Sequence, residues 1–164
     1  MVEAYLDIET TGLSLIYDGI TVIGVYLTDG GYHRFVHLVG EEVTKDNLVE
    51  ALQGVGVIYT YNGSRFDLPF INVSLGVDLA KDFEHHDLML DCWRNNLYGG
   101  LKAVEVQLEI NRQLKGIDGL EAVRLWWRYQ NNNDQDALAI LLKYNEEDVV
   151  NLKTLKEMLE INQE

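Results

Sequence analysis

Apolar residues recur with the period of β-strands in the N-terminal part of the chain and mostly with the period of helices after it. This order constrains the fold more than any other feature of the sequence. Apolar residues alternate with charged and aromatic ones over residues 3–9, which is the period of a β-strand. Residues 20–28 and 32–38 have the same strand character and are joined by the letters DGG, a hairpin signal. We therefore predict three N-terminal strands that run antiparallel to their neighbours in the sequence.

Helical patterns dominate the rest of the chain, interrupted by two short strands at 57–60 and 83–86. A helix capped by Thr44 precedes the first of these strands, and another begins at 67–69, where proline is tolerated in the first turn. Further apolar residues recur at helical spacing. They predict helices at 87–97, 101–109, 118–130 and 134–160, with a loop at 131–133.

This order of elements predicts one mixed α/β domain over residues 1–164. A chain of 164 residues is long enough for one domain with a real core and leaves little room for a second. It contains no linker rich in proline or serine, no low-complexity tract and no internal repeat.

We expect a cytoplasmic protein that does not contact a membrane. No apolar run approaches the length of a bilayer span, and the N-terminus lacks the basic start and apolar stretch of a signal peptide. Cys92 is the single cysteine, which excludes an internal disulfide and a cysteine-rich zinc module. The letters HHD at 85–87 match no zinc spacing with Cys92 and are better explained as a strand end and a helix cap.

Charge is unevenly distributed along the chain. The formal net charge is −14, from 13 basic and 27 acidic residues, so the chain as a whole repels nucleic acid. Residues 93–128 are the exception, with a net charge of +2 and with Trp93, Tyr98, Trp126 and Trp127 among them. Such a mixture suits phosphates and stacked bases. Adjacent tryptophans on a helix, however, usually place one of the two in the core.

Asp7 and Glu9 lie two residues apart at the carboxyl end of the first predicted strand. Their carboxylates therefore project from the same face, at the end of the strand where α/β proteins place ligands. Two carboxylates held close repel each other, and a hard cation relieves that repulsion. The pair alone is weak support for a metal site, because Asp-x-Glu is common on strands that face solvent.

Two further acidic residues follow much later in the chain. Asp67 comes after the strand at 57–60, and Asp148 lies in the helix predicted at 134–160. Tyr144 precedes Asp148 by four residues, so both share one helix face, as a metal ligand and a water-orienting hydroxyl would. Each has an ordinary alternative: a helix N-cap for Asp67, a solvated acidic face for Asp148 and a core position for Tyr144.

The order of these motifs along the chain and their amino-acid sequences resemble those of a known family. LDIETTGL, YNGSRFD and YNEED resemble the three exonuclease motifs of the DEDD superfamily, the DnaQ-like 3′ to 5′ exonucleases, and span the chain from Asp7 to Asp148. The last motif has the Tyr-x-x-x-Asp form of the tyrosine branch, DEDDy, and Lys143 stands where the histidine branch has histidine. The segments HHDLML, GGLKAVE and LLKYNEEDVVNL are similar to the YprB-like ribonuclease H group.

The resemblance implies a ribonuclease H-like fold, a mixed five-stranded sheet flanked by helices, and roles for individual residues. Four carboxylates would bind metal and one phenol would orient the attacking water: Asp7, Glu9, Asp67 and Asp148, and Tyr144. Four residues of the first motif would contact the terminal nucleotide: Thr10, Thr11, Gly12 and Leu13. The remaining candidates for substrate contact are Asn62 and Phe66 of the second motif, and Arg65 and Lys102 as partners of phosphate.

The implied reaction is hydrolysis of a phosphodiester with two divalent ions, Mg²⁺ or Mn²⁺, about 3.5 to 4 Å apart. One ion would activate water and the other would hold the 3′ oxygen, while four carboxylates would offset the charge of both ions. The expected substrate is the 3′ end of single-stranded DNA or RNA. A protein partner or a homo-oligomer is compatible with the acidic exterior.

Two other classes of function remain open from the sequence. A catalytically silent domain could bind nucleic acid or a protein, although the complete set of four carboxylates and a tyrosine argues against lost activity. The other is an endonuclease, or a module that joins a helicase or polymerase, with the acidic exterior as a docking face. Asp87 or Asp91 would line the site if the fifth strand lay beside the first. Charge reversal at Lys102 or Arg112 is expected to weaken substrate binding.

Overall fold

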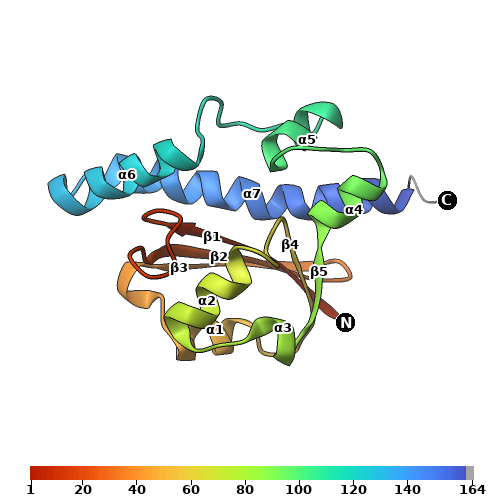
Figure 1. The fold of residues 1–164 in the computed structure, drawn as a ribbon, viewed down its shortest axis with the longest axis horizontal. Helices are drawn as coiled ribbons and strands as arrows, with labels where there is room; N and C mark the ends of the chain where they lie inside the picture. The colour runs from red at the N-terminus through yellow and green to blue at the C-terminus, as the bar shows by residue number, and fades with distance from the viewer. Residues whose placement is uncertain (162–164) are drawn as a thin grey trace.

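A mixed five-stranded sheet forms the centre of the computed structural model, which describes residues 1–161 (Figure 1). The strand order is β3-β2-β1-β4-β5. The strands are β1 (Val2–Thr10), β2 (Ile20–Asp29), β3 (Tyr32–Val39), β4 (Val55–Thr60) and β5 (Glu84–Asp87). The predicted architecture, a mixed five-stranded sheet flanked by helices, is confirmed. Residues 162–164 of the predicted domain lie outside the described residues.

The sheet combines an antiparallel half with a parallel half. β1 pairs antiparallel with β2, and β2 pairs antiparallel with β3, which confirms the prediction for the three N-terminal strands. β1 also pairs parallel with β4, and β4 pairs parallel with β5. The carboxyl ends of β1, β4 and β5 therefore meet at one end of the sheet. That end holds the first two acidic motif residues, Asp7 and Glu9, and the start of the second motif.

Helices cover both faces of the sheet. One face carries α1 (Lys45–Ala51), α2 (Asp67–Leu75) and α3 (Leu79–Asp82), which lie below the sheet in Figure 1. The other face carries α4 (Leu88–Arg94), α5 (Leu101–Gln107), α6 (Gly119–Asn132) and α7 (Gln135–Ile161). A 3₁₀ turn, η1 (Gly40–Glu42), follows β3. Within residues 1–161, no helix has both the length and the apolar composition needed to cross a membrane.

The alternation of residues in β1 decides which face its carboxylates occupy. Leu6 and Ile8 pack into the core shared with α1 and α2, whereas Tyr5 packs into the core shared with α4 and α7. Asp7 and Glu9 have the parity of Tyr5, so they point to the face covered by α7. A slip of one residue would exchange the two faces and bury both carboxylates in the opposite apolar core. The apolar pattern of β1 therefore sets the register that places Asp7 and Glu9 on the face covered by α7.

Two predicted helix N-caps are present in the structure, and a third, the alternative role of Asp67, is not. Thr44 caps α1 through its hydroxyl, and Asp87 caps α4 through its carboxylate, as predicted. The alternative role of Asp67 as a helix N-cap is wrong, because Phe66 is the N-cap of α2 and Asp67 is its first residue. The carboxylate of Asp67 therefore does not cap the N-terminus of α2 and is free for another contact.

The loop predicted at 131–133 is wrong in its first two residues. Asn131 and Asn132 belong to the last turn of α6, and Asn133 ends that helix in the left-handed conformation, with φ of 51°. Asparagine tolerates this conformation better than most residues, so a run of asparagines can end a helix without extending a loop. The short elements η1 and α3 were not predicted, because three or four residues are too few to show a helical period.

The tryptophan pair of α6 divides between core and surface. Trp126 is 7% exposed and packs with Ala122 and Leu141, whereas Trp127 is 45% exposed. The interpretation that one of the two lies in the core is therefore confirmed.

Candidate active site

A cavity of about 520 Å³ opens at the carboxyl end of β1. Its walls come from the loop after β1, the second motif, the starts of α5 and α6, and the middle of α7. The predicted site residues that line it are Asp7, Glu9, Thr10, Thr11, Gly12, Leu13, Phe66, Lys102, Tyr144 and Asp148. A larger groove of about 790 Å³, between η1 and α6, contains none of the four predicted metal ligands. The smaller cavity is therefore the candidate site.

Three of the four predicted metal ligands converge in this cavity. Asp7, Glu9 and Asp148 each offer one carboxylate oxygen, and these oxygens lie within 4.8 Å of one another. Asp67 is not part of this group, and its Oδ2 accepts the backbone N–H of Ile8 at 3.0 Å. The charge of Asp67 still contributes to a raised pKa at Asp7. The structure thus assembles a centre of three carboxylates with a fourth, buried one close to it.

Burial and mutual repulsion make these carboxylates hard to ionise. Burial, followed by the charges of its three acidic neighbours, raises the pKa of Asp7 well above its ordinary value. Burial and the charge of Asp148 raise the pKa of Glu9 to about 8. Burial raises the pKa of Asp67 to about 7, and it also raises the pKa of Asp148 against the opposing charges of a nearby lysine and arginine. The nearby lysine and arginine therefore do not fully offset the cost of ionising these carboxylates.

The donor set fits a hard divalent cation. Mg²⁺ and Mn²⁺ prefer carboxylate oxygens, and a divalent charge would remove the repulsion that raises these pKa values. Asp7, Glu9 and Asp148 are the residues that would hold it. Among residues 1–161, His85, His86 and Cys92 join no such group of metal-binding side chains.

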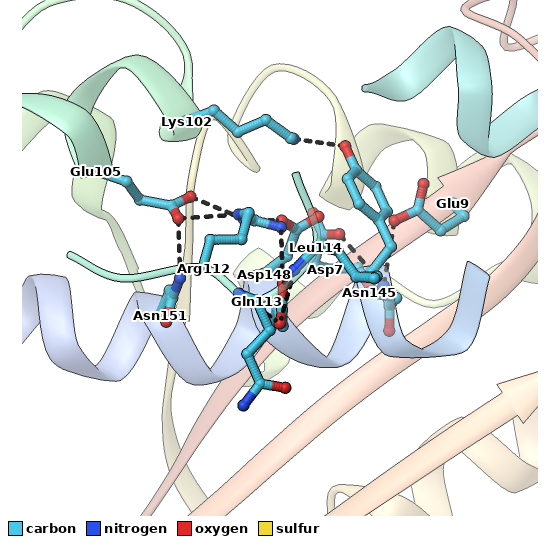
Figure 2. A network of polar contacts seen from close by, with 12 residues as sticks. Asp7, Glu9, Lys102, Glu105, Arg112, Gln113, Leu114, Asn145, Asp148 and Asn151 are labelled. Carbon is cyan, nitrogen blue, oxygen red and sulfur yellow. Dashed lines mark hydrogen bonds and ion pairs between the residues drawn. The ribbon is translucent and has the colours of Figure 1, made fainter. Parts of the chain in front are cut away.

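A buried asparagine absent from the predicted site fixes the two carboxylates of β1. The Nδ2 of Asn145 donates to Asp7 Oδ2 at 3.2 Å and to Glu9 Oε1 at 3.5 Å (Figure 2). Its Oδ1 lies 3.1 Å from His37 Nε2, which secures the amide from the other side. Gly24 makes room for this side chain, because a Cβ at that position would collide with Asn145 Oδ1. The available signal was its place inside the third motif, YNEED.

Lys102 reaches the cavity from the first turn of α5. Its Nζ donates a hydrogen bond to the phenol oxygen of Tyr144 at 2.5 Å and lies 4.4 Å from the centre of that ring. Burial and the surrounding acidic charges raise the pKa of Tyr144 above its ordinary value, so the phenol keeps its proton. Because the oxygen accepts from Lys102, its own O–H remains available to donate to another acceptor.

The loop after β1 is held in shape by Asp18. Its carboxylate accepts the hydroxyl of Thr11 at 3.0 Å and the N–H of Ser14 at 2.9 Å. Gly12 lies against the same carboxylate, and a Cβ at that position would lie 2.5 Å from Asp18 Oδ2. Leu13, at the tip of this constrained turn, is 84% exposed and borders the cavity. The loop therefore presents an apolar side chain in a defined position.

The second motif contributes Phe66 to the cavity but neither Asn62 nor Arg65. Asn62 adopts the left-handed conformation, with φ of 60°, and turns the chain after β4. Arg65 is exposed, and its guanidinium lies 5.5 Å from the ring centre of Trp93. Their predicted contacts with substrate therefore have no support from the lining of this cavity.

Asp87 supports the second motif from behind. Its carboxylate accepts the N–H of Asn62 at 2.8 Å and the N–H and hydroxyl of Ser64 at 3.2 Å and 2.5 Å. β5 lies beside β4 and not beside β1, so the condition for Asp87 or Asp91 to line the site is not met. Asp87 acts on the site through the turn that it holds and through its charge, which helps to raise the pKa of Asp67.

Arg112 is not available to a substrate phosphate, in contrast to the expectation for its charge reversal. Its side chain is 8% exposed and lies between the carboxylates of Glu105 and Asp148 (Figure 2). Charge reversal there would place a buried anion among other anions, so it would disturb the fold before it changed a surface contact.

Comparisons with known proteins agree with this geometry. The sequence pattern of the RNase_H superfamily matches residues 4–160. The family B DNA polymerase from the hyperthermophilic archaeon Pyrobaculum calidifontis has a TM-score of 0.75 at 19% identity, over 97% of this chain and 24% of that chain. The chain thus spans about a quarter of that polymerase.

Brucella melitensis NrnC is similar over a larger share of its length. The structure with bound Mg²⁺ has a TM-score of 0.62 at 23% identity, over 96% of this chain and 71% of that chain. The structure bound to pGG has a TM-score of 0.64 at 22% identity, over the same 96% and 71%. At these identities the likeness shows a shared fold. No curated protein matches the sequence.

Proposed function

Because the chain belongs to the RNase H superfamily, we propose that it is a metal-dependent 3′ to 5′ exonuclease of the DEDDy type that acts on single-stranded DNA or RNA. The observation that carries this proposal is the convergence of Asp7, Glu9 and Asp148 beside Tyr144 in one cavity. All four come from the motifs that resemble those of DnaQ-like exonucleases. The further wording HHDLML, GGLKAVE and LLKYNEEDVVNL favours the YprB-like group within that superfamily.

Two structures of one neighbour, NrnC, support the choice of ligands. NrnC has been solved with bound Mg²⁺ and bound to pGG. In this protein, Asp7, Glu9 and Asp148 would hold a divalent ion, Mg²⁺ or Mn²⁺, and Asp67 would serve a second one through its remaining oxygen. Such ions supply electrostatic stabilisation of the phosphate charge and of the leaving oxygen.

The protein's own groups complete the chemistry. The protonated phenol of Tyr144 can donate to the attacking water and orient it, but it is a poor base because its pKa is raised. The ammonium of Lys102 lies in the cavity wall, where it holds Tyr144 in place and offers its other protons to a phosphate oxygen. Asn145 holds Asp7 and Glu9 in the orientation that the ion requires.

In this proposal, the loop after β1 selects the 3′ end. Asp18 and Gly12 hold this loop rigid, and Leu13 projects from it beside the cavity. An apolar side chain there can stack against the last base and stop the strand, which leaves the terminal phosphodiester at the carboxylates. We expect a circular single strand to resist cleavage and a 3′-phosphate to slow it. Internal cuts in a circle would instead indicate an endonuclease.

Tyr144→Phe should slow cleavage by about fivefold without loss of metal binding. The change removes one hydrogen bond to the attacking water, worth about 1 kcal/mol, and leaves every carboxylate in place. Single-turnover cleavage of a 5′-labelled oligonucleotide measures the rate, and Tyr129→Phe, on α6 outside the cavity, is the matched control. A rate equal to that of the wild type would assign Tyr144 to packing alone.

A further inference from the structure

We propose that Arg112 is a positioning residue that holds the carboxylate of Asp148 in place for a divalent ion. The inference rests on the proposed metal-dependent function and extends it to a residue outside the three motifs. Arg112 lies in the segment between α5 and α6, and neither the motif resemblance nor the cavity lining includes it.

The contacts of Arg112 are those of a fixed side chain. Its Nε and Nη2 donate to the two oxygens of Glu105 at 3.0 Å and 2.7 Å, a bidentate pair. The same Nη2 donates to Asp148 Oδ1 at 2.5 Å (Figure 2). All three side chains are buried, at 8%, 4% and 8% exposure. The planar guanidinium therefore joins two carboxylates at a defined angle and distance.

A second layer of contacts fixes this arrangement to α7. Asn151 donates to Glu105 Oε2 at 2.8 Å, from the turn of α7 that follows Asp148. Glu147 accepts the backbone N–H of Gln113 at 3.0 Å and that of Leu114 at 3.2 Å. Asn151 also donates to the backbone oxygen of Asn111 at 3.3 Å, so the chain on both sides of Arg112 is bound to the helix that carries Asp148.

This geometry divides the two oxygens of Asp148 between two tasks. Oδ1 is bound to Arg112, which leaves the other oxygen to join Asp7 and Glu9 around an ion. Partners of metal ligands commonly fix their orientation in this way, and their loss typically weakens metal binding by about 10- to 100-fold. Since Glu105 balances the charge of Arg112, the pair adds no net charge to the site.

Because Arg112 and Glu105 form a neutral pair, removing both can distinguish a positioning role of Arg112 from an effect of its charge. A positively charged arginine could instead compete with the ion for Asp148, and its removal would then strengthen metal binding. The double variant Arg112→Met with Glu105→Gln leaves the net charge unchanged, because one cation and one anion are lost together. The side chain introduced by Glu105→Gln is uncharged, but its amide oxygen can still accept from Asn151, so that buried contact is kept.

The test is the dissociation constant of Mn²⁺, measured by electron paramagnetic resonance of the free ion in full-length protein. We expect the double variant to bind Mn²⁺ about tenfold or more weakly than the wild type. Arg112→Lys, which keeps the charge but loses the fork, should give an intermediate value. The matched control is Arg124→Met with Glu121→Gln, an exposed pair on α6 that should leave Mn²⁺ binding unchanged. Circular dichroism in EDTA establishes that each variant is folded.

Equal or tighter Mn²⁺ binding by the folded double variant would overturn the positioning role. If that variant does not fold, Arg112→Lys decides, and a dissociation constant equal to that of the wild type rejects the proposal. A wild-type protein that binds no Mn²⁺ would overturn the proposed function together with this inference. If the inference alone fails, the wild type binds Mn²⁺ and cleaves normally while the variants show no loss of Mn²⁺ binding.

Discussion

Replacement of Asp7 or Asp148 by asparagine should lower the rate of 3′-end cleavage by roughly 10³-fold or more. Each change keeps the shape of the side chain but removes one of three negative charges that converge within 4.8 Å. A catalytic cation contributes several kcal/mol to the transition state, and each step of about 1.4 kcal/mol is a factor of ten in rate. Single-turnover cleavage of a 5′-labelled oligonucleotide in Mn²⁺ measures the loss.

The matched control is Asp136→Asn, an exposed carboxylate in the first turn of α7, the helix that also carries Asp148. It should cleave at the rate of the wild type. Both site variants should remain folded, because they relieve repulsion among buried carboxylates. A folded Asp7→Asn protein that cleaves as fast as the wild type would contradict the assignment of the metal centre.

Without metal, the protein should lose stability as the pH rises from about 4.5 to about 8. The pKa of Glu9 is about 8 in the folded protein, above its ordinary value of 4.5. A raised pKa means that the folded state holds the proton more tightly, so this stability is complete below pH 4.5 and lost through pH 8. Asp67, with a pKa of about 7, acts in the same direction.

We expect the loss to be on the order of a few kcal/mol, or roughly 5 to 10 °C in Tm. Thermal unfolding in EDTA at pH 5 and pH 8 measures it. Glu9→Gln should unfold at a higher temperature than the wild type at pH 8 and differ little from it at pH 5. The comparison of the two proteins at each pH cancels the contribution of all other carboxylates. Excess Mg²⁺ should remove most of the loss in the wild type, because the ion binds the ionised carboxylates. A difference between Glu9→Gln and wild type that does not change with pH would contradict the account.

The framework of the site was predictable from local patterns. The period of two in β1 sets the face of Asp7 and Glu9, and the spacing of four residues sets the face shared by Tyr144 and Asp148. Both relations depend only on neighbours in the sequence. The alternation also predicted the antiparallel half of the sheet, because the hairpin between β2 and β3 has a short and recognisable turn.

The contacts that complete the site could not be predicted in the same way. Asn145 reaches Asp7 across 138 residues of sequence, and it can do so only because Gly24 on β2 leaves the space empty. Arg112 has the composition of a surface residue that binds phosphate, yet three buried acidic side chains surround it. Nothing in the local sequence records that these carboxylates meet in space.

Asp67 shows how a motif assignment and a geometry can differ. The motif order groups it with the other three carboxylates, whereas the structure gives one of its oxygens to the backbone of Ile8. That hydrogen bond crosses from α2 to β1 and depends on how the two elements pack. A spacing rule within the second motif cannot contain this information.

Cleavage of 5′-labelled single-stranded DNA and RNA, with Mg²⁺ or Mn²⁺ and with EDTA, tests the central claim most directly. We predict a ladder of products that shortens from the 3′ end in either metal, that disappears in EDTA, and that is absent with Asp7→Asn. Cleavage that persists in excess EDTA, or a wild-type protein that binds these strands but leaves them intact with both metals, would contradict it.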